Sequence, residues 1–213
     1  MRVNSRLFIC LTTALWVTGC GKSDLEKKEE LSERGDTTAQ FELGVTYYLG
    51  EETEQDYVAA ARWYRRAAGG RHASAQYNLG RMLQFGEGVQ ENDAEAAEWY
   101  QRAAEQGLAV AQYNLGWMYE NGEGVTEQDQ EALKWYQQAA AKEYAAAQYN
   151  LGVMHQSGEG VEGNLVEAYA WYNLAASNGH EAAAAGKVKL AEFLDRSQID
   201  EAQSRSRQLR EDF

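Results

Sequence analysis

The hexapeptide Ala-Gln-Tyr-Asn-Leu-Gly decides the fold, because it recurs at a fixed interval along the chain. It occurs unaltered at residues 75–80, 111–116 and 147–152, and a looser copy, Ala-Gln-Phe-Glu-Leu-Gly, lies at residues 39–44. Successive copies are 36 residues apart. Self-similarity with a period of roughly 20–50 residues is typical of stacked supersecondary units. The sequence therefore predicts an array of repeats, with one unit for each copy.

Two further motifs recur with the same spacing and divide each unit into two helices. A Trp-Tyr pair lies at residues 63–64, 99–100, 135–136 and 171–172, and Gly-Glu-Gly-Val lies at residues 86–89, 122–125 and 158–161. In the second unit, apolar residues at helical spacing predict a first helix over residues 74–85 that ends at Gly86. Asn92, followed by Glu95, forms a capping box that predicts the start of the second helix.

We predict an all-α fold, an α-solenoid of about four stacked antiparallel helix pairs with helical caps. The repeats span residues 38–182 and divide into units 39–74, 75–110, 111–146 and 147–182. The Trp-Tyr pairs are expected in the core, and the glycine of the hexapeptide is expected where two helix backbones approach closely.

The segments on either side of the repeats are expected to cap the stack. Residues 183–213 lose the 36-residue pattern but still favour helices, and they are predicted to form a C-terminal helical cap in which Ser197 caps the last helix. Residues 20–37 begin with a cysteine and are dense in charge. They are predicted to form either a solvated tether or a frayed capping helix.

These motifs together resemble the Sel-1-like repeat, a relative of the tetratricopeptide repeat. The resemblance rests on Ala-Gln-x-x-Leu-Gly, Gly-x-Gly-Val and Ala-x-x-Trp-Tyr-x-x-Ala-Ala, and it covers residues 38–182 in four copies. The first copy departs from the pattern, with Gly-Glu-Glu-Thr at residues 50–53 in place of Gly-x-Gly-Val. Such proteins are associated with adaptor roles in membrane-linked complexes. The resemblance therefore implies a protein-interaction scaffold, with the first helices of the units lining a concave face.

The amino terminus has the features of an export signal. Two arginines precede a largely apolar run over residues 7–17, which is too short to span a bilayer and has the dimensions of a signal peptide. Val17-Thr18-Gly19-Cys20 resembles the lipobox of bacterial lipoproteins, which implies removal of residues 1–19 and lipidation of Cys20. In such lipoproteins an Asp after the lipidated cysteine favours retention in the inner membrane, and this chain has Gly21 there, so the resemblance implies sorting to the outer membrane, facing the periplasm. The alternative is an ordinary secretory signal in which Cys20 is incidental.

Composition argues against several classes of function. The formal net charge is −13, and an acidic surface repels phosphate backbones, so no nucleic-acid partner is expected. The repeats contain no cysteine, and their histidines, His72, His155 and His180, lie far apart without the spacing of metal ligands. We therefore expect no catalytic residue, no metal site and no cofactor, and a half-buried packing role for His155.

Positions that differ between the repeats are the candidates for partner binding, because the identical positions build the unit. On the first helix of each unit they form three sets, at residues 45, 81, 117 and 153, at residues 48, 84, 120 and 156, and at residues 49, 85, 121 and 157. These sets lie three or four residues apart and share one helix face. The expected partner-binding residues are Arg81, Gln84, Phe85, Trp117, Glu120 and Gln156.

Trp117 is the outlier among them, because large aromatic side chains are favoured as binding anchors. It alternatively fills a gap beside Met118 or Tyr144.

Three functions remain open at this point. The first is a membrane-anchored, non-enzymatic scaffold that binds an unidentified envelope protein or peptide. The second is a weak β-lactam or peptidoglycan-related hydrolase, which cysteine-rich relatives of the repeat family imply, although those carry a disulfide in each repeat and this chain has none. The third is a passive structural spacer, which predicts a groove without anchoring side chains.

Overall fold

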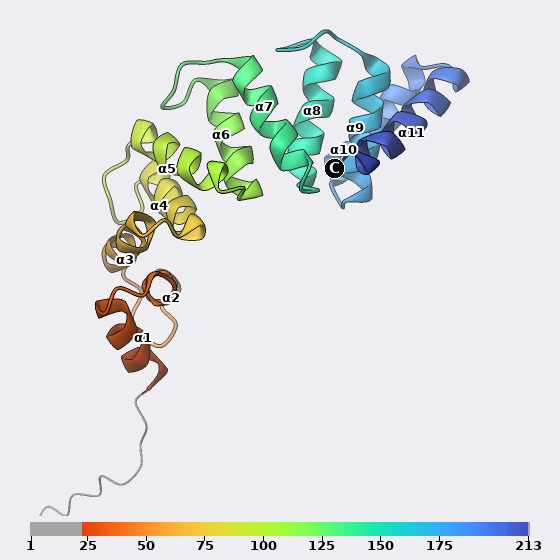
Figure 1. Ribbon diagram of the computed structural model, residues 1–213. Coiled ribbons are helices and arrows are strands. Elements are labelled where there is room, and N and C mark those ends of the chain that lie inside the picture. The colour runs from red at the N-terminus through yellow and green to blue at the C-terminus, as the bar shows by residue number, and fades with distance from the viewer. Residues whose placement is uncertain (1–22, 213) are drawn as a thin grey trace, which may run out of the picture.

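The computed structural model describes residues 23–212, which form a curved stack of helices (Figure 1). The helices are α1 (Asp24–Glu33), α2 (Thr37–Leu49), α3 (Tyr57–Gly69), α4 (Ala73–Phe85), α5 (Asp93–Glu105), α6 (Ala109–Asn121), α7 (Asp129–Ala140), α8 (Ala145–Ser157), α9 (Leu165–Ser177), α10 (Glu181–Leu190) and α11 (Arg196–Glu211), with a short 3-10 helix, η1 (Ala191–Phe193). All regular structure within this part of the chain is helical. The predicted all-α solenoid is confirmed.

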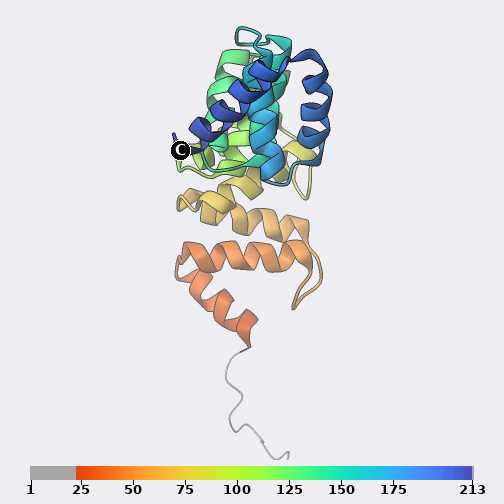
Figure 2. The same cartoon turned by 90° about the vertical axis from the view of Figure 1, so that its right-hand side faces the viewer.

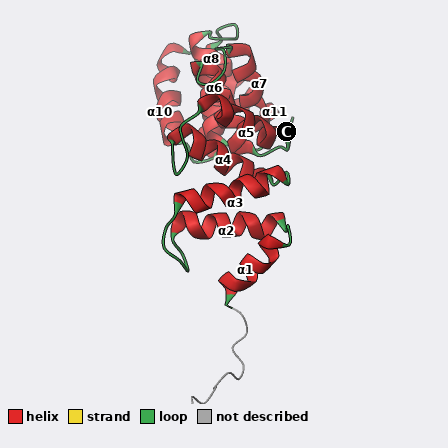
Figure 3. Cartoon of the chain, turned by 90° about the vertical axis from the view of Figure 1, so that its left-hand side faces the viewer, coloured by secondary structure: helices red, strands yellow, loops and turns green. Residues whose placement is uncertain are grey.

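The stack is built from antiparallel helix pairs. Figure 3 shows α2 and α3 lying side by side, and α4 with α5, α6 with α7 and α8 with α9 pair in the same way. The second helix of each pair also packs against the first helix of the next pair. The buried side chains therefore form a continuous core along the array, which a single helix pair lacks.

The hexapeptide glutamine explains how one pair joins the next. The buried Nε2 of Gln76 donates a hydrogen bond of 3.1 Å to the carbonyl oxygen of Ala68, at the carboxyl end of the preceding helix. Gln112 and Gln148 repeat this contact. Carbonyl groups in the last turn of a helix have no partner within the helix. The carbonyl oxygen of Ala68 accepts from the backbone N–H of Arg71 in the following turn, and the glutamine adds a second hydrogen bond from the next helix pair.

The charged segment before the repeats is helical. Ser23 and Glu26 form a capping box at the start of α1, and Gln40 donates to the carbonyl oxygen of Ser32. Gln40 is the glutamine of the looser hexapeptide, so α1 occupies the place of a second helix at the start of the stack. A helix that lacks the Trp-Tyr pair thus covers the exposed side of α2.

The hexapeptide glycine lies where another helix approaches, but the closest group is a side chain. A Cβ atom on Gly116 would lie 2.8 Å from Cδ1 of Tyr136 and 3.3 Å from the carbonyl oxygen of Ala132. Gly44, Gly80 and Gly152 face Tyr64, Tyr100 and Tyr172 in the same way. The expected contact between two backbones is therefore mainly a contact between a glycine and the tyrosine ring of the paired helix.

The Gly-x-Gly loop connects the two helices of one pair and packs against the second helix of the preceding pair. Gly122 ends α6 in the left-handed conformation, with φ of 68°. A Cβ atom on Gly124 would lie 2.3 Å from the carbonyl oxygen of Asp93, the first residue of α5. The second glycine of this loop therefore lets each pair contact the amino-terminal end of the second helix in the preceding pair.

The Trp-Tyr pairs divide their roles, which corrects the expectation that both residues are core. Tyr64, Tyr100, Tyr136 and Tyr172 are buried. The tryptophans of the first three pairs are half-buried, and only Trp171 among the four is buried. Arginine guanidinium groups cover two of them, with Arg66 at 4.6 Å from the Trp63 ring centroid and Arg102 at 4.3 Å from that of Trp99. The reason is helical geometry, because adjacent residues on a helix point in different directions. The tyrosine points between the two helices of the pair, and the tryptophan before it points to the edge of the helix pair.

The helix α11 covers the carboxyl-terminal end of the stack. It packs against α9, and Figure 2 shows it crossing the end of the array. Ala202, Ser206 and Leu209 form its buried side, as expected. Its cap differs from the prediction, because Asp195 and not Ser197 accepts the hydrogen bond from the Gln198 backbone. The backbone N–H of Asp195 in turn donates to Oε1 of Gln198 at 2.9 Å, which completes a capping box.

Candidate functional site

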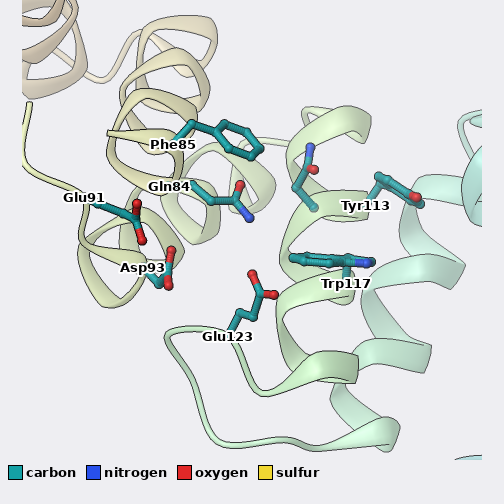
Figure 4. A pocket seen from close by; sticks show the side chains of 8 residues that line it. Gln84, Phe85, Glu91, Asp93, Tyr113, Trp117 and Glu123 are labelled. Carbon is teal, nitrogen blue, oxygen red and sulfur yellow. The ribbon is translucent and has the colours of Figure 1, made fainter. Parts of the chain in front are cut away.

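A pocket of about 630 Å³ lies between the second and third helix pairs. Its walls are the carboxyl end of α4, the loop and first turn that lead into α5, and one face of α6 with its following loop. The lining residues are Gln84, Phe85, Glu91, Asp93, Tyr113, Asn114, Trp117 and Glu123. Figure 4 shows Phe85 and Gln84 on α4 facing Trp117 on α6, with the Glu123 carboxylate directed toward the same space.

Two aromatic side chains of this pocket differ in how far they are buried. Phe85 is 62% exposed, although it is a large apolar residue. Trp117 is half-buried and packs against the buried clusters of both neighbouring pairs, so one side of its indole is fixed by the core. Phe85 is available for contact with a partner, and Trp117 provides a firmly held wall.

The acidic side chains of the pocket are not neutralised. Glu91 is exposed, and Asp93 and Glu123 are half-buried. Within residues 23–212, none of the three forms an ion pair with a lysine or arginine, and the pocket lining contains no basic side chain. The pocket thus combines aromatic surface with three unpaired carboxylates.

Residues 84, 120 and 156, which are glutamine or glutamate on the first helices of three repeats, accept hydrogen bonds from the buried tyrosines of the second helices. The Tyr136 hydroxyl donates a hydrogen bond of 2.6 Å to a carboxylate oxygen of Glu120. Tyr100 donates to Gln84 at 2.9 Å and Tyr172 to Gln156 at 2.7 Å. Burial, followed by the hydrogen bond and charge of Glu120, raises the pKa of Tyr136 above its ordinary value. The hydroxyl therefore remains a donor.

Arg81 lies at the junction before this pocket and is engaged within the chain. Its guanidinium lies 4.7 Å from the ring centroid of Tyr48 and 3.3 Å from a carboxylate oxygen of Glu87. The Tyr48 hydroxyl donates to the same carboxylate at 3.0 Å. These contacts tie the first helix pair to the second.

The family follows from comparison with known proteins. The Sel1 repeat model matches residues 37–70, 73–108, 109–144 and 145–180. The chain belongs to the Sel1 repeat family. Each matched copy begins at the first residue of α2, α4, α6 or α8, so one Sel1 repeat corresponds to one helix pair.

Solved structures and a curated protein extend this relationship. A Sel1 repeat protein from Oxalobacter formigenes is 30% identical, with a TM-score of 0.70, and the alignment covers 78% of this chain and 74% of that one. A protective antigen of uropathogenic Escherichia coli with an SLR fold is 40% identical, with a TM-score of 0.72, over 74% of this chain and 34% of the antigen. The secretory immunoglobulin A-binding protein EsiB of Escherichia coli O6:H1 is 43% identical over 47 residues, which are 22% of this chain and 10% of EsiB. The chain thus matches about a third of the antigen and a tenth of EsiB.

The Sel1 repeats bring only part of the expected partner-binding set together. Gln84, Phe85 and Trp117 line the pocket. Arg81, Glu120 and Gln156 do not line it. The expectation also left out Glu91, Asp93 and Glu123, which lie in the loops and the first turn of α5. A comparison of the loops between repeats, like the one made for the first helices, would have found them. Cys20, the expected lipidation site, lies outside the described residues.

The histidines of the Sel1 repeats have structural contacts. His72 and His180 each accept a hydrogen bond at Nδ1 from a backbone N–H at the start of a helix, and each stacks on an aromatic ring, 4.5 Å between centroids. His155 is half-buried, as expected, and burial lowers its pKa. Among the described residues, no cluster of three or more His, Cys, Asp or Glu is arranged to hold a metal ion.

Proposed function

We propose that this Sel1 repeat chain is a non-enzymatic scaffold of the bacterial cell envelope that binds a segment of another protein in the pocket between α4, α5 and α6. Sel1 repeat proteins are generally protein-interaction scaffolds, and EsiB is named for binding an immunoglobulin. The observation that carries the proposal is the exposed Phe85 facing the firmly held Trp117.

The variation between repeats supports the same surface. Phe85 takes the place that Leu49, Asn121 and Ser157 hold in the other repeats, and Trp117 takes the place of Arg81 and Val153. Neither aromatic is needed to build the repeat unit, since the other units fold without it. A passive spacer has no use for an exposed phenylalanine beside a tryptophan, whereas aromatic anchors are typical of binding interfaces.

Site-specific crosslinking tests this function. A photoreactive amino acid is placed at position 85 in living cells, with position 193 as the matched control, because Phe193 is also an exposed phenylalanine, 73% exposed, but lies in η1. We expect a discrete crosslinked partner from position 85 that is absent from position 193 and is lost in Trp117→Ala. Identical products from both positions, or none from either, would contradict the proposal.

We also propose that the scaffold is tethered to the membrane by lipid on Cys20, with residues 1–19 removed and the repeats facing the periplasm from the outer membrane. The support is the lipobox-like Val17-Thr18-Gly19-Cys20 after a short apolar run. Multiple acyl chains give stable anchoring, where a single chain is marginal. None of the described helices is long and apolar enough to cross a bilayer.

The anchor has its own test, independent of the pocket. Cys20→Ser is expected to accumulate as uncleaved precursor and to lose labelling by radioactive palmitate, while the membrane fraction loses the protein. Cys10→Ser is the matched control, since Cys10 lies inside the apolar run. Labelling that survives Cys20→Ser would show that the lipobox assignment is wrong.

A further inference from the structure

The first and second helix pairs meet in a contact equivalent to the pocket, and there charged side chains of the chain itself fill the space. We call the space between one helix pair and the first helix of the next pair a junction. At the first junction the guanidinium of Arg81 lies over the Tyr48 ring and pairs with Glu87. The side chains of Arg81 and Glu87 are only 29% and 27% exposed. One cation and one carboxylate therefore neutralise each other against an aromatic ring.

The pocket is the same set of positions one repeat later. Each lining residue lies 36 residues after a residue of the first junction, so that Trp117 corresponds to Arg81 and Glu123 to Glu87. The carboxylate is thus kept while its cation is replaced by an aromatic ring. Glu91 and Asp93 further replace the uncharged Gln55 and Tyr57. The first junction is neutral, and the second carries three carboxylates and no basic lining residue.

This combination has a definite chemical preference. The face of a tryptophan attracts a guanidinium or ammonium group, and tryptophan does so better than tyrosine or phenylalanine. Carboxylates add hydrogen bonds assisted by charge, and the attraction is stronger where the groups are half-buried, as Asp93 and Glu123 are. The groups around the pocket therefore match a cation that the chain itself does not place there.

We propose that the pocket binds an arginine or lysine side chain of an extended peptide segment, with its cation between the Trp117 ring and the Glu123 carboxylate. The segment carries an apolar side chain beside the basic one, because Phe85 is exposed at the rim of the pocket. A volume of about 630 Å³ accommodates both side chains. The proposal rests on the scaffold function above and names the chemistry of its partner.

The third junction provides an internal comparison. Glu127, Asp129 and Glu159 repeat the three acidic positions, but Asn121 and Val153 stand in place of Phe85 and Trp117. Glu120 adds a fourth carboxylate at the position of Gln84, and its oxygen accepts from the Tyr136 hydroxyl. The third junction is therefore at least as acidic as the pocket but lacks the aromatic side chains of Phe85 and Trp117. We therefore expect basic segments to be held at the second junction and not at the third.

A peptide library tests the proposal on the full chain in mild detergent. Phage-displayed dodecapeptides are selected on the wild type and on Trp117→Arg, in which the new guanidinium is expected to pair with Glu123 and occupy the pocket. Circular dichroism checks that the variant is folded. We expect the wild type to enrich sequences with arginine or lysine next to an apolar residue, and Trp117→Arg to lose this enrichment.

Affinities of one selected peptide then separate charge from shape. Replacing its basic residue with citrulline, or joining Glu91→Gln with Glu123→Gln in the protein, is expected to weaken binding about tenfold or more, since both remove a charge from a paired site. The matched control joins Glu127→Gln with Glu159→Gln at the third junction and is expected to change the affinity less than about twofold, since distant charges are screened. This pair of double variants does not depend on Trp117.

Each other outcome overturns the inference in an identifiable way. Enrichment of neutral or acidic sequences, or none that depends on Trp117, refutes a basic partner, while a crosslink from position 85 still supports the scaffold function. Loss of both the crosslink and the enrichment refutes both proposals. A wild type that self-associates while Trp117→Arg is monomeric assigns the pocket to a second copy of the chain. A crosslink from position 85 to residues 20–22 assigns it to the amino terminus of the processed chain.

Discussion

In the second, third and fourth repeats the buried tyrosine donates its hydroxyl to one acceptor on the facing helix. Tyr136 is fully buried, and its hydroxyl donates to Glu120. A buried hydroxyl without a partner costs about 1–3 kcal/mol, more than a typical hydrogen bond contributes. Because Gln84 and Gln156 do for Tyr100 and Tyr172 what Glu120 does for Tyr136, an oxygen acceptor matters here and its charge does not.

We predict that Glu120→Ala lowers the free energy of unfolding by about 1–3 kcal/mol, because it leaves the Tyr136 hydroxyl without its acceptor. Glu120→Gln should be close to wild type, since the second and fourth repeats use glutamine at this position. Urea denaturation measures both. In a double-mutant cycle, Tyr136→Phe should remove most of the cost of Glu120→Ala, and purely additive effects would contradict this role for Glu120.

A second prediction concerns pH and His72. Its Nδ1 accepts the Ala75 N–H at 3.3 Å, and burial lowers its pKa below the ordinary 6.5. The unfolded chain therefore binds the proton more tightly, so this contribution to stability is present above pH 6.5 and is lost as the pH falls from 6.5 through the lower pKa of the folded protein. Asn at this position keeps a cap without titrating.

We therefore expect the free energy of unfolding of the wild type to fall more steeply than that of His72→Asn between about pH 7.5 and about pH 5.5, in urea titrations at constant ionic strength. The pKa of His155 is also lowered, but that residue is present in both proteins and its effect cancels in the comparison. Parallel declines would show that protonation of His72 does not weaken the cap.

The sequence distinguishes the positions that are identical in all repeats from those that vary. It does not tell which of the varying positions contact a partner and which contact the core. The sequence predicted Phe85 and Trp117 at a binding surface, and both line the pocket. It treated Gln84, Glu120 and Gln156 as free because they differ between repeats, yet the three share an acceptor oxygen that holds a tyrosine. Variation that preserves the chemistry of a contact cannot be distinguished from free variation without the partner atom in view.

At the scale of the helices, local signals were sufficient for most boundaries. The helix predicted over residues 74–85 is Ala73–Phe85, and its left-handed cap is Gly86. Asn92 caps α5 as its capping-box pattern indicated. The burial of the Trp-Tyr pairs was less predictable, because two adjacent residues on a helix point in directions about 100° apart. Only the packing of the next helix decides which of them is enclosed.

The contact between the hexapeptide glycine and the tyrosine ring gives a prediction for the helix pair. Gly116→Leu places a side chain within 2.8 Å of the Tyr136 ring, and overpacking of this kind costs about 1–3 kcal/mol. The matched control is Gly69→Leu, because a Cβ atom on Gly69 meets nothing within 4 Å. We expect calorimetry to show a clear fall in melting temperature for Gly116→Leu alone, and equal melting temperatures would contradict the steric role of Gly116.

At the scale of the whole molecule, the pocket is formed by parts of two repeats. Its lining comes from α4, α5, α6 and two loops, so neither repeat contains it alone. The 36-residue period fixed which units are neighbours, but not which of their side chains meet at a junction. Placing Asp93 opposite Trp117 requires the angle between successive pairs, which the sequence does not state.

Stability should also be distributed along the array, because each pair contacts only its neighbours. We predict that Leu209→Asp, which buries a charge beneath α11, lowers hydrogen-exchange protection first in α8, α9 and α11 and leaves α2 to α5 protected. Gln208→Asp is the matched control, as Gln208 is exposed on the same helix. Equal loss of protection over all helices, measured by mass spectrometry, would show instead that the described residues unfold as one unit.

The direction of the contacts between repeats has a consequence for how such a chain changes in length. Gln76 closes the carboxyl end of α3 and Gly88 contacts its first residue, so each repeat is completed by the one that follows it. The last pair is followed by α10, which packs against α9 but has alanine in place of the glutamine and no Gly-x-Gly loop. The helix α11 supplies further contacts to α9, with Arg205 paired to Glu167 and Arg210 donating to Ser177. A block of 36 residues can therefore be duplicated inside the array without leaving an unfinished helix, provided that α11 stays behind α9. Unequal recombination between the DNA segments that encode the hexapeptides would add or remove whole junctions. The residues of each added junction could then diverge and form a new pocket.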